Sequence, residues 1–384
     1  MSQCSRLAGA LLLAFLALPL HSQGSAVWKD PSPHTTRFVT VDKDVRLEVL
    51  DWGGSGRPIV LLAGGGNTAH VFDDFAPKLT AYCHVYGITR RGFGASGYSA
   101  TDHPADRLGD DVVAVIDALN LKRPILAGHS IAGVELSSVA NSHPNRVAGL
   151  VYLDAAYSYA FDNGKGASSM EIQKLQGPQP PPPNETDLAS FSSLQKYYER
   201  VNGFLFPEAE LRAQRETTPD GGVGKQRDLP GGALFMPLMT GTKKYTAIPV
   251  PALVIFANPH SQGLWVDKNA DPSVQIAAKT YSAALEALTE RQEKSVESGV
   301  PTARVTHIPG ANHYRQRLKS LKVDANPKDV TASERHRALF LEGLGVERAT
   351  AIRLRDEGRI GDDVLRRIER ELDLDESRLT NREK

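Results

Sequence analysis

Short apolar runs alternate with helical patterns between residues 37 and 309 of the chain. Such alternation is typical of a doubly wound sheet in which most strands are parallel. Three of the runs, at 58–62, 124–127 and 252–257, are almost continuously apolar, as expected of parallel strands that helices cover on both faces. The pattern predicts a mostly parallel sheet of about eight strands. Their expected positions are 37–41, 46–52, 58–62, 84–89, 124–127, 148–153, 252–257 and 304–308.

The regular alternation is interrupted between residues 155 and 248. This stretch contains a proline-rich segment at 176–183 and glycine pairs at 221–222 and 231–232. Long irregular insertions in a regular fold are usually functional, so we interpret residues 155–248 as a cap or lid inserted after the sixth strand. Its large apolar residues either line a pocket or pack the cap onto the sheet, and the sequence leaves both open. These residues are Phe204, Phe206, Phe235, Met236 and Met239.

The amino terminus has the pattern of an export signal. Arg6 precedes an apolar run at 7–20, and the small residues Gly24 and Ala26 follow it. The run is too short to span a bilayer comfortably, and small residues suit signal-peptidase cleavage. The pattern predicts a signal peptide over residues 1–26, a secreted or periplasmic protein and no stable membrane anchor.

Residues 315–384 differ from the rest of the chain because charges of both signs alternate there. Apolar residues recur at helical spacing among these charges, which predicts a separate tail of short charged helices. They are Leu354, Ile360, Val364, Leu365, Ile368 and Leu372. Residues 354–374 resemble the cytoplasmic tail of bacterial sodium/proton antiporters, which conflicts with an export signal. A gene fusion, an assembly artefact and a genuine module for helix–helix contacts all remain open.

Charge and cysteine content narrow the class of protein. The 45 basic residues balance the 45 acidic ones, so no overall field would attract nucleic acid or anionic lipid. Cys4 falls in the predicted signal, which leaves Cys83 without an intramolecular partner and suggests a buried thiol. These features favour an enzyme with a small-molecule substrate over a nucleic-acid-binding protein.

The strongest chemical signal is a serine between a strand and a helix. Ser130 follows the apolar run at 124–127, and Gly128 and Ala132 lie on either side of it. A nucleophile on a sharp strand-to-helix turn requires small neighbours, because larger side chains collide there. The segment therefore predicts a nucleophile elbow with Ala132 in the position of the usual last glycine.

Three further motifs follow the order found in the α/β-hydrolase family, which the chain resembles between residues 37 and 314. Residues 59–66 are similar to its oxyanion loop, although Ala63 replaces the usual histidine. Residues 89–96 resemble its Asp-x-Arg-Gly-x-Gly-x-Ser turn, with Thr89 in place of the aspartate, and residues 308–313 resemble its histidine loop. The resemblance implies an α/β-hydrolase domain over residues 27–314.

The resemblance also implies a role for each site residue. Gly65 and Ile131 would supply the two backbone N–H groups of the oxyanion hole, and His313 would act as base for Ser130. Asp154 ends the sixth strand and would orient His313, consistent with the chain order Ser, Asp, His. The family more often places its acid after the seventh strand, where Asp267 is the nearest carboxylate, and a site without a normal acid is a further possibility.

Two glycine-rich segments allow other interpretations. Residues 92–97 read Gly-x-Gly-x-x-Gly, as in nicotinamide-binding proteins, but they follow the fourth strand rather than the first and a turn-rich stretch follows them. Residues 64–66 are not followed by the Gly-Lys-Ser/Thr of a phosphate-binding loop. We therefore expect no organic cofactor and no metal in the catalytic reaction.

Together these motifs predict a serine hydrolase. The expected reaction is cleavage of a carboxylic ester, or of an amide or lactone, through an acyl-enzyme on Ser130. The same triad could instead serve acyl transfer or cofactor-free perhydrolysis. A catalytically silent binding protein on the same fold is the alternative from another class. The sequence does not specify the acyl group or the oligomeric state.

Overall fold

The computed structural model describes residues 28–99, 106–234, 244–308, 348, 351–353, 355–356, 358 and 361–380. Several predictions made from the sequence lie outside these residues. They concern the signal peptide at 1–26, the base His313, most of the tail, and the cap residues Phe235, Met236 and Met239.

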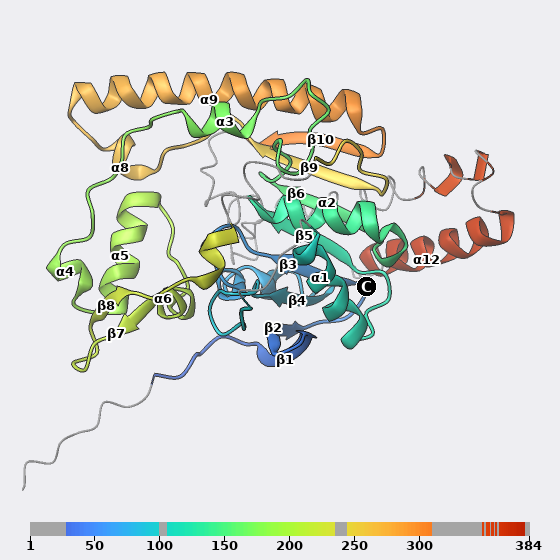
Figure 1. Cartoon of the computed structure of the whole chain (residues 1–384), viewed down its shortest axis with the longest axis horizontal. Helices are drawn as coiled ribbons and strands as arrows, with labels where there is room; N and C mark the ends of the chain where they lie inside the picture. Colours follow the sequence, from blue (N-terminus) through green and yellow to red (C-terminus); the bar gives the residue numbers. More distant parts are fainter. Residues whose placement is uncertain are drawn as a thin grey trace, which may run out of the picture.

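An eight-stranded sheet forms the centre of the fold, in the order β1-β2-β4-β3-β5-β6-β9-β10 (Figure 1). The β1–β2 and β2–β4 pairs are antiparallel, and all other neighbours are parallel. The predicted α/β-hydrolase fold is confirmed, and each predicted strand is found within two residues of its expected ends. The strands are β1 (Thr35–Asp42), β2 (Val45–Gly53), β3 (Pro58–Leu62), β4 (His84–Ile88), β5 (Ile125–His129), β6 (Gly149–Leu153), β9 (Ala252–Ala257) and β10 (Ala303–Ile308).

Both faces of the sheet are buried, which explains the continuous apolar runs. Alternate side chains of a strand point to opposite faces. In β3, Val60 and Leu62 enter one apolar cluster, together with residues of α1 (Arg107–Ala118) and α2 (Ala132–Ser142). Ile59 and Leu61 enter the other cluster, on the opposite face. The long helix α9 (Pro272–Gly299) contacts β10, at the top of Figure 1.

The chain between β6 and β9 forms short elements that lie largely to one side of the sheet in Figure 1. In order, they are α3 (Ser169–Gln173), α4 (Glu185–Leu188), α5 (Phe191–Asn202), α6 (Glu208–Gln214), β7 (Arg215–Thr217), β8 (Val223–Gln226) and η4 (Pro230–Leu234). The β7–β8 hairpin was not anticipated from the sequence. The domain boundaries proposed from the sequence remain predictions.

Helix α5 shows how this region is attached. Ser190 caps its first turn by accepting the Ser193 N–H at 3.0 Å, and Gly203 ends it with φ +82°. Its apolar face joins the second cluster through Phe191, Leu194, Tyr197 and Val201. Phe204 and Phe206 also pack there, with ring centroids 5.0 Å apart. Of the two roles considered for Phe204 and Phe206, lining a pocket or packing this region onto the sheet, the structure therefore shows packing.

Helix α12 (Asp362–Thr380) contains the helical spacing predicted for the tail. Leu365 and Leu372, two turns apart, are buried on it. Arg348 pairs with Asp373 at 2.9 Å and with Glu376 at 2.8 Å. In the described part of the chain, no helix is both long and apolar enough to cross a membrane.

Candidate active site

Ser130 lies at the junction of β5 and α2 with φ +54°, in the left-handed region that non-glycine residues rarely adopt. A Cβ atom on Gly128 would lie 3.0 Å from the Ala132 Cβ, and one on Gly133 would lie 1.9 Å from the Ala155 carbonyl oxygen. The turn is therefore too crowded for larger residues. This close packing presents the Ser130 side chain at the carboxyl end of the sheet.

Asp154 occupies the end of the neighbouring strand β6, also with a positive φ of +49°. The Ser130 N–H donates to the Leu153 carbonyl at 3.2 Å, which ties the two strand ends together. The Asp154 side chain is completely buried. Its Oδ1 accepts the Tyr157 hydroxyl at 2.9 Å and the Ala257 N–H at 3.1 Å. A buried carboxylate held by several donors is suited to orienting an imidazole.

His260 is the one histidine that the described residues place against this carboxylate. Its Nε2 lies 3.0 Å from Asp154 Oδ2, and its side chain is 9 % exposed. Its Nδ1 is buried and has no hydrogen-bond partner among the described residues. Sequence reasoning missed His260. The available signal was its position after the seventh strand, β9, where the family more often places its acid.

The two remaining candidates for the triad are His313 and Asp267. His313 lies outside the described residues. Asp267, the alternative acid, ends α8 (Leu264–Asp267) and is exposed to solvent. The described contacts bring Asp267 to neither Ser130 nor Asp154, whereas they tie the strand ends that carry Ser130 and Asp154 together.

Two buried tyrosines complete the surroundings. Burial raises the pKa of Tyr159, the negative charge of Asp154 raises it further, and a hydrogen bond with Ser130 opposes both. Burial, followed by the charge of Asp154, also raises the pKa of Tyr157 well above its usual value. Both phenols therefore stay neutral at physiological pH. Tyr159 lies beside Ser130 and Tyr157 beside Asp154.

The predicted oxyanion groups lie on adjacent strand ends. Gly65 is in the loop after β3, Ile131 follows Ser130, and β3 pairs with β5. Within the described ranges, no hydrogen bond uses the N–H of Gly65 or of Ile131. Both groups are thus available to a ligand oxygen, as an oxyanion hole requires.

Three surrounding elements fix the loop that carries Gly65. Arg90 donates to the Ala63 carbonyl at 2.8 Å and to both oxygens of Glu135 on α2, at 2.9 and 2.7 Å. From α6, the buried Glu210 accepts the Asn67 side-chain amide at 2.8 Å and the Thr68 N–H at 3.2 Å. The turn after β4, helix α2 and helix α6 (Glu208–Gln214) therefore all hold the loop that carries Gly65.

Thr89 has a clear role although it departs from the family motif. Its hydroxyl donates to Glu48 Oε2 at 2.7 Å and accepts the Ala69 N–H at 3.0 Å. Glu48 comes from β2, so the carboxylate that the motif usually supplies reaches this turn from a different strand.

Comparison with known proteins agrees with this architecture. A putative non-heme haloperoxidase of Mycobacterium phage D29 is 33% identical over 104 residues, which are 27% of this chain and 37% of that protein. A bifunctional esterase/perhydrolase of Acinetobacter calcoaceticus is 28% identical over 112 residues, or 28% of this chain and 40% of that protein. The chain thus spans less than half of either relative.

Among solved structures, an E-2-(acetamidomethylene)succinate hydrolase is similar with a TM-score of 0.49 and 17% identity, covering 73% of this chain and 92% of that one. The model of the "Alpha/beta hydrolase family" matches residues 59–318, more than half of the chain. This match supports the prediction of a hydrolase. The chain therefore belongs to the alpha/beta hydrolase family.

Proposed function

We propose that this protein hydrolyses a carboxylic ester, or an amide or lactone, through an acyl-enzyme on Ser130. The observation that supports this most strongly is the pairing of two strand ends. Ser130 stands at a crowded strand-to-helix turn, and the fully buried Asp154 ends the adjacent strand. Unusual backbone conformations of this kind cluster at active sites, and both residues have one.

In the proposed reaction, His313 takes the proton of Ser130 as the serine oxygen attacks the substrate carbonyl carbon. Asp154 orients His313 and stabilises its cation. The N–H groups of Gly65 and Ile131 bind the oxygen that becomes negative. The carbonyl–oxygen bond to the leaving alcohol then breaks, and the alcohol receives the proton from His313. Water repeats the sequence on the acyl-enzyme, releasing the carboxylic acid and free Ser130.

The test is turnover of a series of p-nitrophenyl esters by Ser130→Ala, with Ser142→Ala as the matched control. Ser142 is an exposed serine at the end of the same helix, α2. Loss of the nucleophile is expected to lower kcat on the order of 10⁶-fold, whereas the control should retain full activity. Near-normal hydrolysis by Ser130→Ala would end the proposal, and so would the absence of turnover of any ester, amide or lactone by the unaltered protein.

Perhydrolysis is the second candidate, because a relative is described as a bifunctional esterase/perhydrolase. In that reaction hydrogen peroxide replaces water at the acyl-enzyme and a peracid leaves. Both reactions start from the same acyl-enzyme, so measuring carboxylic acid and peracid in one sample distinguishes hydrolysis from perhydrolysis. A peracid yield that exceeds hydrolysis at millimolar peroxide would favour perhydrolysis as the principal reaction.

We also propose that residues 1–26 direct export of the enzyme. The support is the charge and apolar pattern of this segment, with small residues at Gly24 and Ala26. Amino-terminal sequencing of protein recovered outside the cytoplasm should find a new terminus near these residues. Protein that stays in the cytoplasm with its apolar run intact would contradict export.

A further inference from the structure

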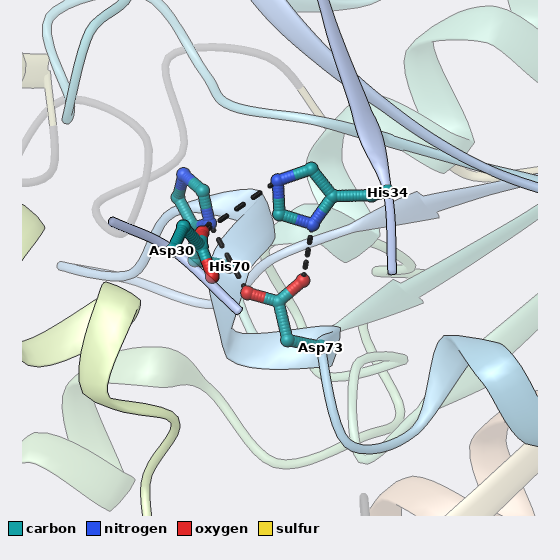
Figure 2. A group of neighbouring side chains, drawn as sticks. All are labelled: Asp30, His34, His70 and Asp73. Atoms are coloured by element: carbon teal, nitrogen blue, oxygen red, sulfur yellow. Dashed lines mark hydrogen bonds and ion pairs between the residues drawn. The ribbon is translucent and has the colours of Figure 1, made fainter. Parts of the chain in front are cut away.

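Two histidines and two aspartates meet where the segment before β1 lies against the loop region that follows β3. They are Asp30, His34, His70 and Asp73 (Figure 2). The first two precede β1, whereas His70 lies in the short helix η1 (Ala69–Phe72) and Asp73 directly follows it. One nitrogen or carboxylate oxygen from each residue lies within 4.8 Å of the others. Segments far apart in the sequence thus converge on one point.

The spacing of these atoms fits a shared ion. His34 Nε2 is 3.6 Å from Asp30 Oδ2, and His70 Nδ1 is 3.4 Å from the same oxygen. His70 Nδ1 is 3.1 Å from Asp73 Oδ2. Ligand atoms about 2.0–2.1 Å from a tetrahedral zinc ion are about 3.3 Å from one another. The 3.1 Å contact is also a hydrogen bond, whereas the contacts at 3.4 and 3.6 Å are longer than the usual hydrogen-bond distance.

The remaining atoms of the cluster face supporting groups. His34 Nδ1 lies 2.8 Å from Asp73 Oδ1, which also accepts the indole N–H of Trp52 at 3.1 Å. His70 Nε2 lies 3.6 Å from Glu48 Oε1. Both nitrogens of His34 therefore lie near carboxylates of the cluster itself, whereas His70 directs one nitrogen to the cluster and the other to Glu48, outside it. Metal-binding histidines usually have the arrangement of His70, which fixes the tautomer and the ring orientation.

The charge balance of the cluster favours a cation. Three carboxylates, of Asp30, Asp73 and Glu48, surround two imidazoles, and in the described structure no lysine or arginine pairs with these carboxylates. The side chains of His34 and Asp73 are only 5 % and 2 % exposed. These carboxylates therefore present a net negative charge to the centre of the cluster, which favours a bound cation.

We propose that Asp30, His34, His70 and Asp73 bind one divalent transition-metal ion, with Zn²⁺ the best match. Two imidazole nitrogens and two carboxylate oxygens are the kinds of donor that Zn²⁺ takes in four-coordinate sites, whereas Ca²⁺ and Mg²⁺ prefer oxygen alone. All four positions are filled by protein groups, which is typical of a structural site. The ion fastens the segment before β1 to η1. Because η1 directly follows the oxyanion loop, the ion also stabilises the base of that loop.

The test is Zn²⁺ titration of the metal-free, full-length protein by calorimetry, followed by Co²⁺ substitution and visible spectroscopy. We expect one Zn²⁺ per chain and the intense visible bands of tetrahedral Co²⁺. His34→Ala and His70→Ala should each weaken Zn²⁺ binding at least a hundredfold. His143→Ala is the matched control, because His143 also pairs with an aspartate, Asp110 at 3.3 Å, but at the surface. It should bind Zn²⁺ normally.

Asp30→Asn is the variant expected to disturb folding least, because Asp30 is the most exposed of the four residues, with its side chain 23 % accessible. It should retain the circular dichroism spectrum of the unaltered protein and bind Zn²⁺ at least tenfold more weakly. The proposal is overturned if no Zn²⁺ binds at micromolar concentration, or if Ca²⁺ binds in preference. Unchanged Zn²⁺ affinity in Asp30→Asn and both histidine variants would also overturn it, since the metal would then bind elsewhere.

Discussion

Asp154 and Asp73 are both buried aspartates in contact with histidine, yet their surroundings differ. Among the described residues, Asp154 accepts from two neutral donors, the Tyr157 hydroxyl and the Ala257 N–H, and contacts one histidine, His260. Asp73 shares two histidines with Asp30, and Glu48 reaches one of them. A single carboxylate with neutral donors is suited to a histidine cation that exists only during the reaction. Several carboxylates together are suited to a metal cation that stays bound, as proposed for the cluster around Asp73.

The largest expected effect tests the first half of this contrast. Asp154→Asn should lower kcat on the order of 10⁴-fold, because the amide cannot hold the catalytic imidazole in the correct tautomer. Asp267→Asn is the control, since the Asp267 side chain is exposed and should tolerate the change. Ester turnover by both variants is compared after circular dichroism shows that both are folded. A larger loss in Asp267→Asn would place the acid after the seventh strand.

Asp73→Asn tests the second half through stability. Removing one partner from a buried group of charges typically costs about 3–5 kcal/mol, and the Asp73 side chain is only 2 % exposed. Urea unfolding in the presence of a chelator should show a loss of this order. The folded variant should keep far more ester turnover than Asp154→Asn. Equal losses of activity in the two variants would contradict the separation of the two clusters.

His260→Ala asks whether the second histidine matters to the acid. Hydrogen bonds to charged groups contribute about 1.5–3 kcal/mol, so kcat should fall about ten- to a hundredfold while KM changes little. His84→Ala is a control with an equally direct contact, since His84 lies 2.8 Å from Asp51 on the sheet. A pH–rate profile is the second readout. The pH dependence of kcat should shift in His260→Ala if His260 positions Asp154. An unchanged profile with normal kcat would show that His260 has no part in the reaction.

Glu210→Gln should have the smallest effect. Glu210 holds Asn67 and Thr68 behind the oxyanion loop, and the amide retains its shape but loses charge and one accepting oxygen. We expect kcat to fall about tenfold, equivalent to about 1.4 kcal/mol in the barrier. Glu208→Gln, on the partly exposed side of the same helix, serves as control. A loss confined to KM would mean that Glu210 shapes substrate binding and not the loop.

The parts of the fold that could be predicted are those that depend on local pattern. Buried strands such as β3 and β9 were predictable because helices cover both of their faces, so their apolar runs are continuous. Ser130 was identifiable because the crowded turn requires small neighbours. Asp154 was preferred to Asp267 from the sequence because it ends a predicted strand and fits the chain order Ser, Asp, His, and the structure adds that Asp154 is buried whereas Asp267 is exposed.

The remaining features depend on contacts between distant segments. His260 reaches Asp154 across 106 positions of the chain, and its position after β9 was the one sequence signal that pointed to this edge of the sheet. His34 and Asp73 are 39 positions apart, and the segment before β1 has no periodic pattern that predicts where it docks. The strands of the β7–β8 hairpin have only three and four residues, and the pairing register shifts between Arg215 and Thr217. They therefore lack a clear alternation of polar and apolar side chains. Tertiary packing decides all three.

The most direct test of the central claim is labelling with a fluorophosphonate, which reacts with activated serines. The account predicts one adduct per chain, mapped by mass spectrometry to the peptide containing Ser130, and no adduct in Ser130→Ala. Asp154→Asn should label far more slowly, and Asp73→Asn should label like the unaltered protein while it remains folded. An adduct on another serine, or no adduct on a folded protein that turns over esters, would contradict Ser130 as the nucleophile.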